Sequence, residues 1–321
     1  MISAFILADS VGPNGVRITS FELKYPRFMH AELMTHRAFS RNASSSRAIP
    51  VKKQIQLIKN SPAVPMAFTK NKPGMQGGIL LEGEEHQKAV SAWLRGCDRA
   101  IEIASELADL EVHKQYANRV LEPYAHISVV LTATDFDNFY WLRWHKDALP
   151  EMQALAKAMW LAQQGSTPRE LSPGMLHLPL VTNDEYLDIL LKFRDLPGSN
   201  YYDPYDDPAV WELWMPLIKR SVARCARVSY LNHEGGESTF EQDEALYKKL
   251  RLSDEQPHAS PLEHQAMCVH YSKHYKSGNF RGWKQFRHMV YGDTVRPFVP
   301  PEGDLKYPDQ GDKVTEGDKP C

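Results

Sequence analysis

The sequence feature that most constrains the fold is a pair of strand-like segments on either side of a long helical pattern. Residues 16–25 alternate between apolar and polar side chains, and residues 126–134 form a β-branched run. Both patterns are typical of β-strands. Between them, apolar side chains recur at helical spacing over residues 84–109. The sequence therefore predicts strands and long helices within one chain.

Other segments extend this alternation. Apolar spacing and proline positions predict further helices, at 28–42, 112–121, around 139–143, 150–164, 184–194, 208–224 and 240–251. In the first of these, Leu33, Met34 and Phe39 are the expected inward positions. Asp135 or Asp137 is the expected cap of the helix around 139–143, and residues 265–274 are expected to form a strand.

Composition divides the chain into segments. Proline, glycine, asparagine and aspartate are dense around 165–179 and 197–207, which predicts a connector over 165–215 between residues 1–164 and 216–302. Residues 303–321 are rich in glycine, aspartate, lysine and proline and are expected to form a mobile tail.

Charge and cysteine usage exclude several classes of protein. The net charge of −2 gives no general attraction to nucleic acid or to an anionic membrane. The four scattered cysteines form no CxxC pair, which favours a reducing, cytoplasmic setting. The first residues lack a basic, apolar leader, and no run of about eighteen apolar residues predicts a membrane span.

Residues 34–47 are the strongest candidate for a binding site. This stretch holds three arginines, one histidine and four serines. Arginine presents a planar fork of donors that matches phosphate, and serine-rich turns add hydroxyl and backbone donors. The stretch therefore suggests a site for a phosphorylated small molecule, with a solvated helix end as the alternative.

Recognisable catalytic motifs are missing from the sequence. It contains no P-loop, no G-x-G-x-x-G after a strand and no G-x-S-x-G, and no cysteine lies in a Pro-Cys-Gln context. Any chemistry is therefore expected to depend on a cofactor. The histidines at 258, 264, 270 and 274 lack the pattern of a zinc site, and no metal is expected.

Two aromatic segments leave their role open. Arg143 lies between Trp141 and Trp144, where it could be a stacked ligand fork or could simply cover an aromatic core. The basic and aromatic residues of 279–287 could stack on a ring system or form a surface helix.

Three blocks together resemble the flavin-dependent thymidylate synthases. The family signature, Arg-His-Arg followed after seven residues by Ser, corresponds to Thr35-His36-Arg37 and Ser45, with Arg47 two residues later. A second block corresponds to Arg119 through Pro123, then Asn138, Leu142-Arg143, Ala148 and Glu151. The family's opening block corresponds to residues 226–229 (Ala-Arg-Val-Ser) and 258–264 (His-Ala-Ser-Pro-Leu-Glu-His).

The resemblance implies an α+β fold with a sheet flanked by helices. Since the family's opening block falls last, it also implies a circularly permuted order: the central and C-terminal blocks in 1–164, the connector over 165–215, and the N-terminal block in 216–302. Permutation is tolerated where chain termini lie close together on the surface.

The resemblance further implies reductive methylation of dUMP to dTMP by a cytoplasmic homotetramer. FAD would be the cofactor, with NADPH and methylenetetrahydrofolate as co-substrates, and neither a membrane nor a nucleic acid would be a partner. The implied catalytic residues are Arg143 and Ser45. The implied nucleotide-binding residues are Glu32, Ser44, Ser45, Ser46, Arg47, Arg119 and Arg143. The implied flavin-binding residues are His36, Arg37, Asn42, Asn138, Ser229 and His264.

The chain departs from the family pattern in ways that keep alternatives open. Thr35 replaces an arginine, Ala43 replaces a glutamate, and Glu32 stands where a glutamine is common. Thr132 and Thr134 replace an asparagine and an arginine near the flavin, and the nearby basic residues Arg281, Lys284 and Arg287 could compensate. The alternatives are a methylase or hydroxymethylase of dCMP or dUMP, and a nucleotide-binding protein without catalysis.

Overall fold

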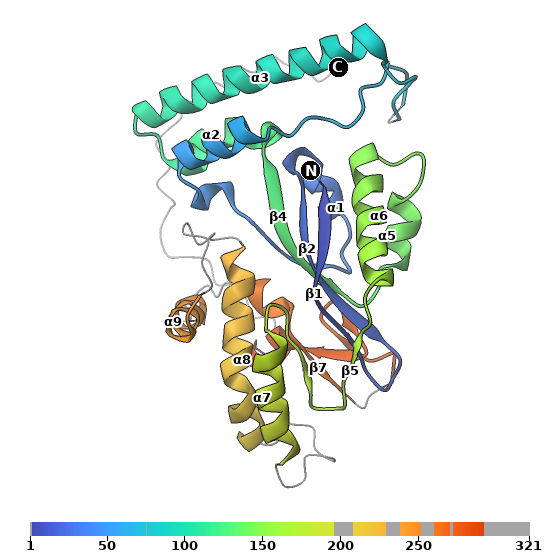
Figure 1. Cartoon of the computed structure of the whole chain (residues 1–321), viewed down its shortest axis with the longest axis vertical. Helices are drawn as coiled ribbons and strands as arrows, with labels where there is room; N and C mark the ends of the chain where they lie inside the picture. The colour runs from blue at the N-terminus through green and yellow to red at the C-terminus, as the bar shows by residue number, and fades with distance from the viewer. Residues whose placement is uncertain are drawn as a thin grey trace, which may run out of the picture.

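The computed structural model describes residues 2–74, 76–195, 208–228, 238–251, 260–269 and 272–291. It shows an α+β fold built around a five-stranded sheet with strand order β3-β4-β2-β1-β5 (Figure 1). The strands are β1 (Ser3–Val11), β2 (Arg17–Pro26), β3 (Ser40–Ala43), β4 (His126–Ala133) and β5 (Arg169–Glu170). Neighbouring strands are antiparallel except for β1 and β5, which are parallel.

One face of this sheet carries the first hydrophobic core. Alternate residues of β2 and β4, such as Phe21, Leu23 and Val129, point to this face and are buried. They pack against α1 (His30–Met34), α5 (Asp137–Arg143) and α6 (Pro150–Gln164). Figure 1 shows α5 and α6 side by side along this flank. These helices therefore hold the segment after β2 and the segment after β4 against one core.

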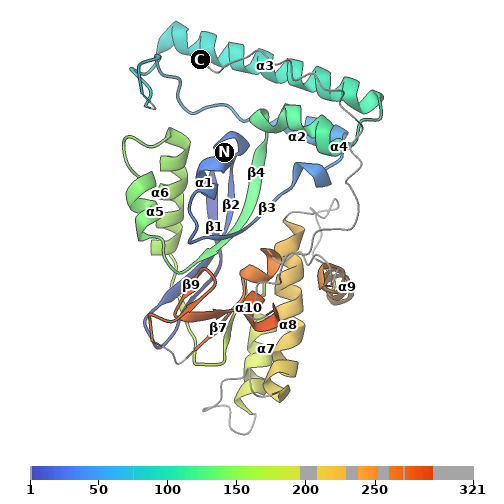
Figure 2. The same cartoon turned by 180° about the vertical axis from the view of Figure 1, so that it is seen from behind.

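A helical layer lies across one end of the sheet. It contains α2 (Val51–Asn60), the 27-residue α3 (Gly83–Asp109), α4 (Lys114–Ala117) and the 3₁₀ helix η3 (Asn118–Tyr124). A small core, with Ile58, Ala104 and Leu121 at its centre, joins these helices. The two opposite views agree that α3 runs along the outer surface of the molecule (Figure 2).

The C-terminal half forms a second core below the sheet. It is built from α7 (Asn183–Arg194), α8 (Pro208–Arg227) and α9 (Phe240–Arg251). These helices pack beside a three-stranded sheet of order β10-β7-β6. Its strands are β6 (Leu176–His177), β7 (Ala266–Cys268) and β10 (Trp283–Gln285). The remaining elements are η1 (Arg27–Met29), η2 (Ser46–Ala48), η4 (Ser260–Glu263), β8 (Lys276–Ser277), β9 (Phe280–Arg281) and α10 (Phe286–Tyr291).

Most element predictions are confirmed, and the exceptions have physical reasons. The helix expected over 28–42 is wrong beyond Met34, because residues 40–43 pair with β4 as strand β3. Met34 is consequently exposed, whereas Leu33 and Phe39 are buried as expected. No aspartate caps α5, since Phe136 is its N-cap and Asp137 lies in its first turn.

Other segments differ from expectation in similar ways. The helix expected over 112–121 divides into α4 and η3, and among the described residues of 265–274 the strand is β7. Of the two alternatives left open for the segment near 281–289, a helix begins only at Phe286, because residues 283–285 pair with β7. The described part of the predicted connector contains the expected helix as α7 and also contributes β5 and β6 to the two sheets. The predicted tail at 303–321 lies outside the described residues.

Candidate functional site

The first group of predicted site residues gathers around the guanidinium of Arg143. This side chain leaves the last turn of α5 and points toward α1 and the turn that follows it. Its Nε donates to His36 Nε2 at 2.8 Å, and its Nη2 donates to Thr35 Oγ1 at 3.2 Å. Its Nη1 lies 3.4 Å from Glu32 Oε2. The structure thus brings Glu32, His36 and Arg143 together from segments more than a hundred residues apart.

The geometry requires His36 to accept a hydrogen bond at Nε2. Burial, followed by the nearby charges of Arg143 and Arg41, lowers the pKa of His36 to about 4. The ring is therefore neutral at physiological pH and can leave Nε2 unprotonated. A neutral histidine orients the guanidinium without cancelling its charge, and only 23% of the Arg143 side chain is exposed.

A second group forms around Glu122 in η3. Its carboxylate accepts a hydrogen bond from Ser46 Oγ at 2.7 Å and pairs with Arg27 Nη2 at 3.0 Å and Arg119 Nη1 at 3.2 Å. Arg27 also donates to the carbonyl of Ser44. Two arginines share one carboxylate here, so the group keeps a net positive charge. Glu122 and Arg27 were not predicted as site residues, since only the three-dimensional position of the carboxylate reveals their contacts.

Two further predicted arginines are exposed and unpaired. Arg37 lies in the turn after α1, and Arg47 lies in η2. Neither has a polar partner among the described residues. Between the two groups, Arg41 donates to the carbonyls of Leu33 and Met34 at the end of α1. We refer to the arginines of η1, the turn after α1, β3, η2, η3 and α5 together as the arginine face: Arg27, Arg37, Arg41, Arg47, Arg119 and Arg143.

The serines and asparagines predicted for the site have mixed environments. Ser44 exchanges hydrogen bonds with the backbone of Ser128 on β4. Ser45 precedes η2 and is partly exposed, and Asn138 is exposed on α5. Asn42 donates to the Cys225 carbonyl at 2.6 Å and accepts from Ser260 Oγ at 3.2 Å. Asn42 thus joins β3 to the C-terminal half of the molecule.

His264 is completely buried and belongs to a chain of hydrogen bonds. Its Nδ1 lies 2.9 Å from Thr132 Oγ1, which lies 2.6 Å from Ser20 Oγ. Ser20 in turn lies 2.8 Å from His177 Nε2, and His177 Nδ1 lies 2.9 Å from Ser10 Oγ. We call these five residues the hydroxyl–imidazole chain. It passes from the second sheet through the polar face of the first.

Burial dominates the protonation of both histidines in this chain. It lowers the pKa of each to about 3, with the mutual proximity of the two rings acting in the same direction on His264. Although the Nε2 atom of His264 is buried, it has no hydrogen-bond partner within the described part of the chain. Buried polar atoms are rarely left unpaired, so this atom is suited to a further ligand or water.

Several sequence hypotheses concern residues around this site. Ser229 and the histidines at 258 and 270 lie outside the described residues. Within the described residues, no three His, Cys, Asp or Glu side chains group as metal ligands. Arg281 forms an ion pair with Asp135, and Arg287 forms one with Glu263. Two of the three basic residues that could compensate for the missing arginines, Arg281 and Arg287, are therefore already paired.

Comparisons with known proteins agree with the resemblance over the first half of the chain. Residues 17–169 match the family model described as thymidylate synthase complementing protein. This matched segment contains every residue of the arginine face. No curated protein sequence matches the chain. In the part of the chain that the structure describes, no helix combines the length and apolar character needed to cross a membrane.

Two of the similar solved structures show the UMP/dUMP methylase PolB from Streptomyces cacaoi with different bound nucleotides. The form bound with 5-Br dUMP is 19% identical, with a TM-score of 0.42, and the match covers 50% of this chain and 89% of that one. The form bound with 5-Br UMP is also 19% identical, with a TM-score of 0.43, and the match covers 50% of this chain and 88% of that one.

Proposed function

We propose that this protein is a flavin-dependent thymidylate synthase that methylates dUMP at C5 to give dTMP. The observation that carries the proposal is the contact of Arg143 with His36, Thr35 and Glu32 inside the segment that matches the thymidylate synthase complementing protein family. The carbon would come from methylenetetrahydrofolate, and bound FAD, reduced by NADPH, would supply the hydride.

The arginine face provides the groups that a nucleoside monophosphate needs. Arg47 is exposed and has no polar partner in the described ranges, so its fork is available for the phosphate, with Ser45 nearby in sequence. Arg119 is 58% exposed and retains donors beyond its pair with Glu122. Ser44 and Ser46 fix the turn through their contacts with β4 and η3. This arrangement would hold the phosphate while the base extends toward Arg143.

Arg143 is placed to act on the pyrimidine ring. Three acceptors fix its guanidinium, so little reorganisation is needed when negative charge develops on the base during attack from C5. The neutral His36 orients this cation, as its lowered pKa of about 4 allows. We therefore assign Arg143 the stabilisation of the developing charge and His36 the positioning of Arg143.

The described thiols support a reaction that needs no enzyme nucleophile. Burial raises the pKa of Cys225 and of Cys268 to about 12, and it also raises the pKa of Cys97. These three thiols therefore remain protonated at neutral pH and are poor nucleophiles. Transfer of the folate carbon in the proposed reaction requires no thiolate.

The residues present fit a flavin nucleotide. The unpaired Nε2 of His264 and the exposed donors of Arg37 and Asn138 are suited to the polar atoms and phosphates of such a ligand. His264 reaches the polar face of the sheet from the last predicted block, and Asn42 joins the same regions. This contact between first and last blocks supports the permuted order. A homotetramer in the cytoplasm remains part of the proposal.

One observation favours a second candidate, a nucleotide-binding protein that does not use flavin. Arg281 and Arg287 are paired with Asp135 and Glu263, so they do not replace the cations lost at Thr35 and Thr134. The positions Glu32 and Ala43 similarly motivate a related methylase or hydroxymethylase that acts on dCMP.

Product analysis separates these candidates. The protein, loaded with FAD, is incubated with NADPH, methylenetetrahydrofolate and either dUMP or dCMP, and the nucleotides are analysed by mass spectrometry. The proposal predicts dTMP from dUMP only. A methylated or hydroxymethylated product from dCMP would contradict the proposal and favour the related methylase or hydroxymethylase. Nucleotide binding without any product would favour the second candidate.

A further inference from the structure

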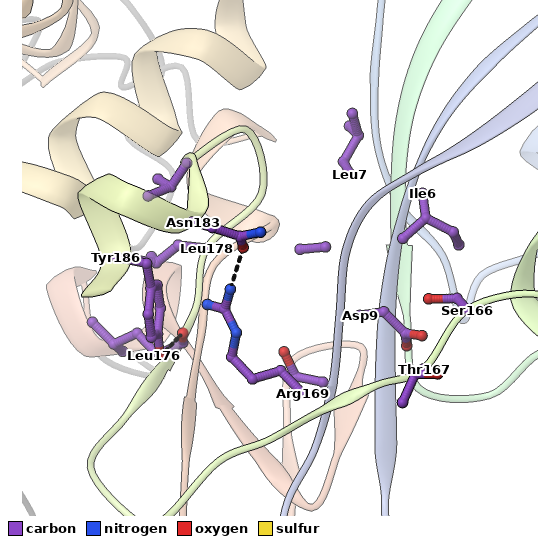
Figure 3. Close-up of a pocket in the computed structure, with 13 residues that line it drawn as sticks. Ile6, Leu7, Asp9, Ser166, Thr167, Arg169, Leu176, Leu178, Asn183 and Tyr186 are labelled. Carbon is purple, nitrogen blue, oxygen red and sulfur yellow. Dashed lines mark hydrogen bonds between the residues drawn. The ribbon is translucent and has the colours of Figure 1, made fainter. Parts of the chain in front are cut away.

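A separate cavity of about 340 Å³ lies at the opposite edge of the first sheet from β3. It is formed between β1, the segment leading into β5, β6 and the start of α7. Figure 3 shows Arg169 reaching across it toward Asn183, with β1 on the other side. The volume is at the lower end of the range of small-molecule sites. None of the residues predicted for the nucleotide or the flavin lines this cavity.

Arg169 gives the cavity a positive charge that its lining does not balance. Its Nη2 donates to Asn183 Oδ1 at 2.6 Å, and its guanidinium carbon lies 4.2 Å from the ring centre of Tyr186. Within the described ranges, no carboxylate lies at ion-pair distance from Arg169. The stacking and the single amide contact hold the guanidinium in place, while other donors of its fork remain available.

The single acidic side chain of the described lining is already neutralised. Asp9 accepts hydrogen bonds from Arg17 Nε at 2.8 Å and Nη2 at 2.6 Å, and another from Thr19 Oγ1 at 3.1 Å. Since both carboxylate oxygens are engaged by Arg17, Asp9 does not cancel the charge of Arg169. The cavity therefore favours an anionic ligand.

The rest of the lining is mostly polar where a ligand could reach it. Leu176, Leu178 and Tyr186 are buried and expose little apolar surface to the cavity, whereas Ser166 and Thr167 bring hydroxyl groups to it. A compact acid with a short carbon body would therefore meet the cation and polar groups without needing a large apolar contact.

We propose that this cavity binds a small organic anion, with its acid group on Arg169 and its short carbon body inside the cavity. Carboxylates and phosphate esters share the planar or near-planar oxygen pairs that a guanidinium recognises. The site lies beyond the proposed nucleotide site and does not depend on it.

The hydroxyl–imidazole chain provides a local reporter of occupancy. Ser10 lines the cavity and lies 2.9 Å from His177 Nδ1. An anion on Arg169 changes the electrostatic field at His177, because the guanidinium already acts on that ring. The imidazole nitrogens of His177 should therefore respond to ligands in this cavity.

The experiment uses three probes with the same alkyl body: butyrate, butyl phosphate and butanol. Each is titrated into the full-length protein labelled with ¹⁵N-histidine, and the His177 nitrogen shifts report binding. We expect saturable shifts with at least one anion at about millimolar Kd and none with butanol. Butyrate and butyl phosphate distinguish a carboxylate ligand from a phosphate ester.

Variants locate the site. Arg169→Met should weaken the anion's Kd at least about tenfold, and Asn183→Ala, which removes only the amide contact, should weaken it several-fold. Arg99→Met, an exposed arginine on α3, and Arg47→Ala, in the proposed nucleotide site, should leave the response at His177 unchanged. Asn183→Ala keeps the test decisive if Arg169→Met does not fold.

Three results would overturn the proposal. One is the lack of any His177 response to either anion up to about 10 mM. Another is an unchanged Kd in both Arg169→Met and Asn183→Ala. The third is equal binding of butanol, which would show a purely apolar cavity.

Discussion

The arginine face and the hydroxyl–imidazole chain are two polar regions of the molecule that differ in charge and in exposure to solvent. The arginine face keeps more positive charges than negative ones and exposes several of them, as at Arg47 and Arg119. The chain carries no charge, since burial keeps His177 and His264 neutral, and its five side chains are buried.

This difference indicates what each region contributes. Exposed, partly unpaired cations contribute little to folding and are free to bind an anion. Buried, neutral hydrogen bonds contribute to stability because breaking one leaves a costly unpaired group. Substitutions in the arginine face should therefore change ligand affinity and rate, whereas substitutions of Ser20, Thr132 or His177 in the chain should change the free energy of unfolding.

The largest expected effect follows from Arg143→Ala. Loss of this cation should lower kcat/KM for dUMP by about a thousandfold, in line with removal of one preorganised donor in other enzymes. Steady-state kinetics of the FAD-loaded protein check this, with urea unfolding as a control for stability. Arg143→Lys keeps the charge but loses the contacts of the fork, so it should recover only part of the rate.

The hydroxyl–imidazole chain should make the protein sensitive to acid. His177 and His264 have folded pKa values of about 3, below the unfolded value near 6.5. The unfolded state therefore binds more protons as pH falls through 6.5, and stability is lost on acidification. Between pH 7.5 and 5.5, each histidine should lower the free energy of unfolding by about 1.4 kcal/mol, and the two together by about 3 kcal/mol.

Urea unfolding at the two pH values measures this loss. His177→Gln should reduce the pH-dependent loss by about 1.4 kcal/mol, whatever its effect on stability at pH 7.5. His145→Gln, an exposed histidine after α5, is the matched control. An identical pH dependence in wild type and His177→Gln would show that His177 is not buried and neutral.

A smaller effect is expected for Arg47→Ala. Removing this partner of the phosphate should weaken dUMP binding by about 2 kcal/mol, close to thirtyfold in Kd. The free energy of unfolding should stay the same, because Arg47 has no partner among the described residues. Calorimetric titration measures the Kd of dUMP for Arg47→Ala and for the control variant Arg99→Ala. An unchanged dUMP Kd would remove Arg47 from the nucleotide site.

The smallest effect is expected for Thr132→Val in the chain. The valine would leave Ser20 Oγ and His264 Nδ1 without their shared partner, which should cost about 1–2 kcal/mol of stability. Thr134→Val, two residues later and partly exposed, is the control and should cost less. Equal losses in thermal or urea unfolding would contradict a special role for the buried chain.

The sequence predicted the arginine face better than the chain. Thr35 to Arg47 is one continuous stretch of unusual composition, so its exposure and charge could be inferred locally. Even there, the strand at 40–43 was missed, because its pairing with β4 depends on residues ninety positions away. Glu122 was also missed as an organising group, since its three partners come from separate elements.

The chain could not be predicted from local patterns. Ser20, Thr132 and His177 are ordinary residues in their own segments, and only the crossing of two sheets brings them together. In the connector that supplies His177, the sequence predicted only the helix at 184–194, yet the described part also contributes β5, β6 and part of the second core. Long-range pairing, rather than local propensity, decided these elements.

The central claim is that the arginine face and His264 form a nucleotide and flavin site, and the visible spectrum tests it most directly. The protein is mixed with FAD, freed of unbound flavin by gel filtration and titrated with dUMP. The account predicts that flavin is retained and that its visible absorption bands shift with saturation as dUMP binds. A colourless protein after gel filtration, or bands that dUMP leaves unchanged, would contradict it.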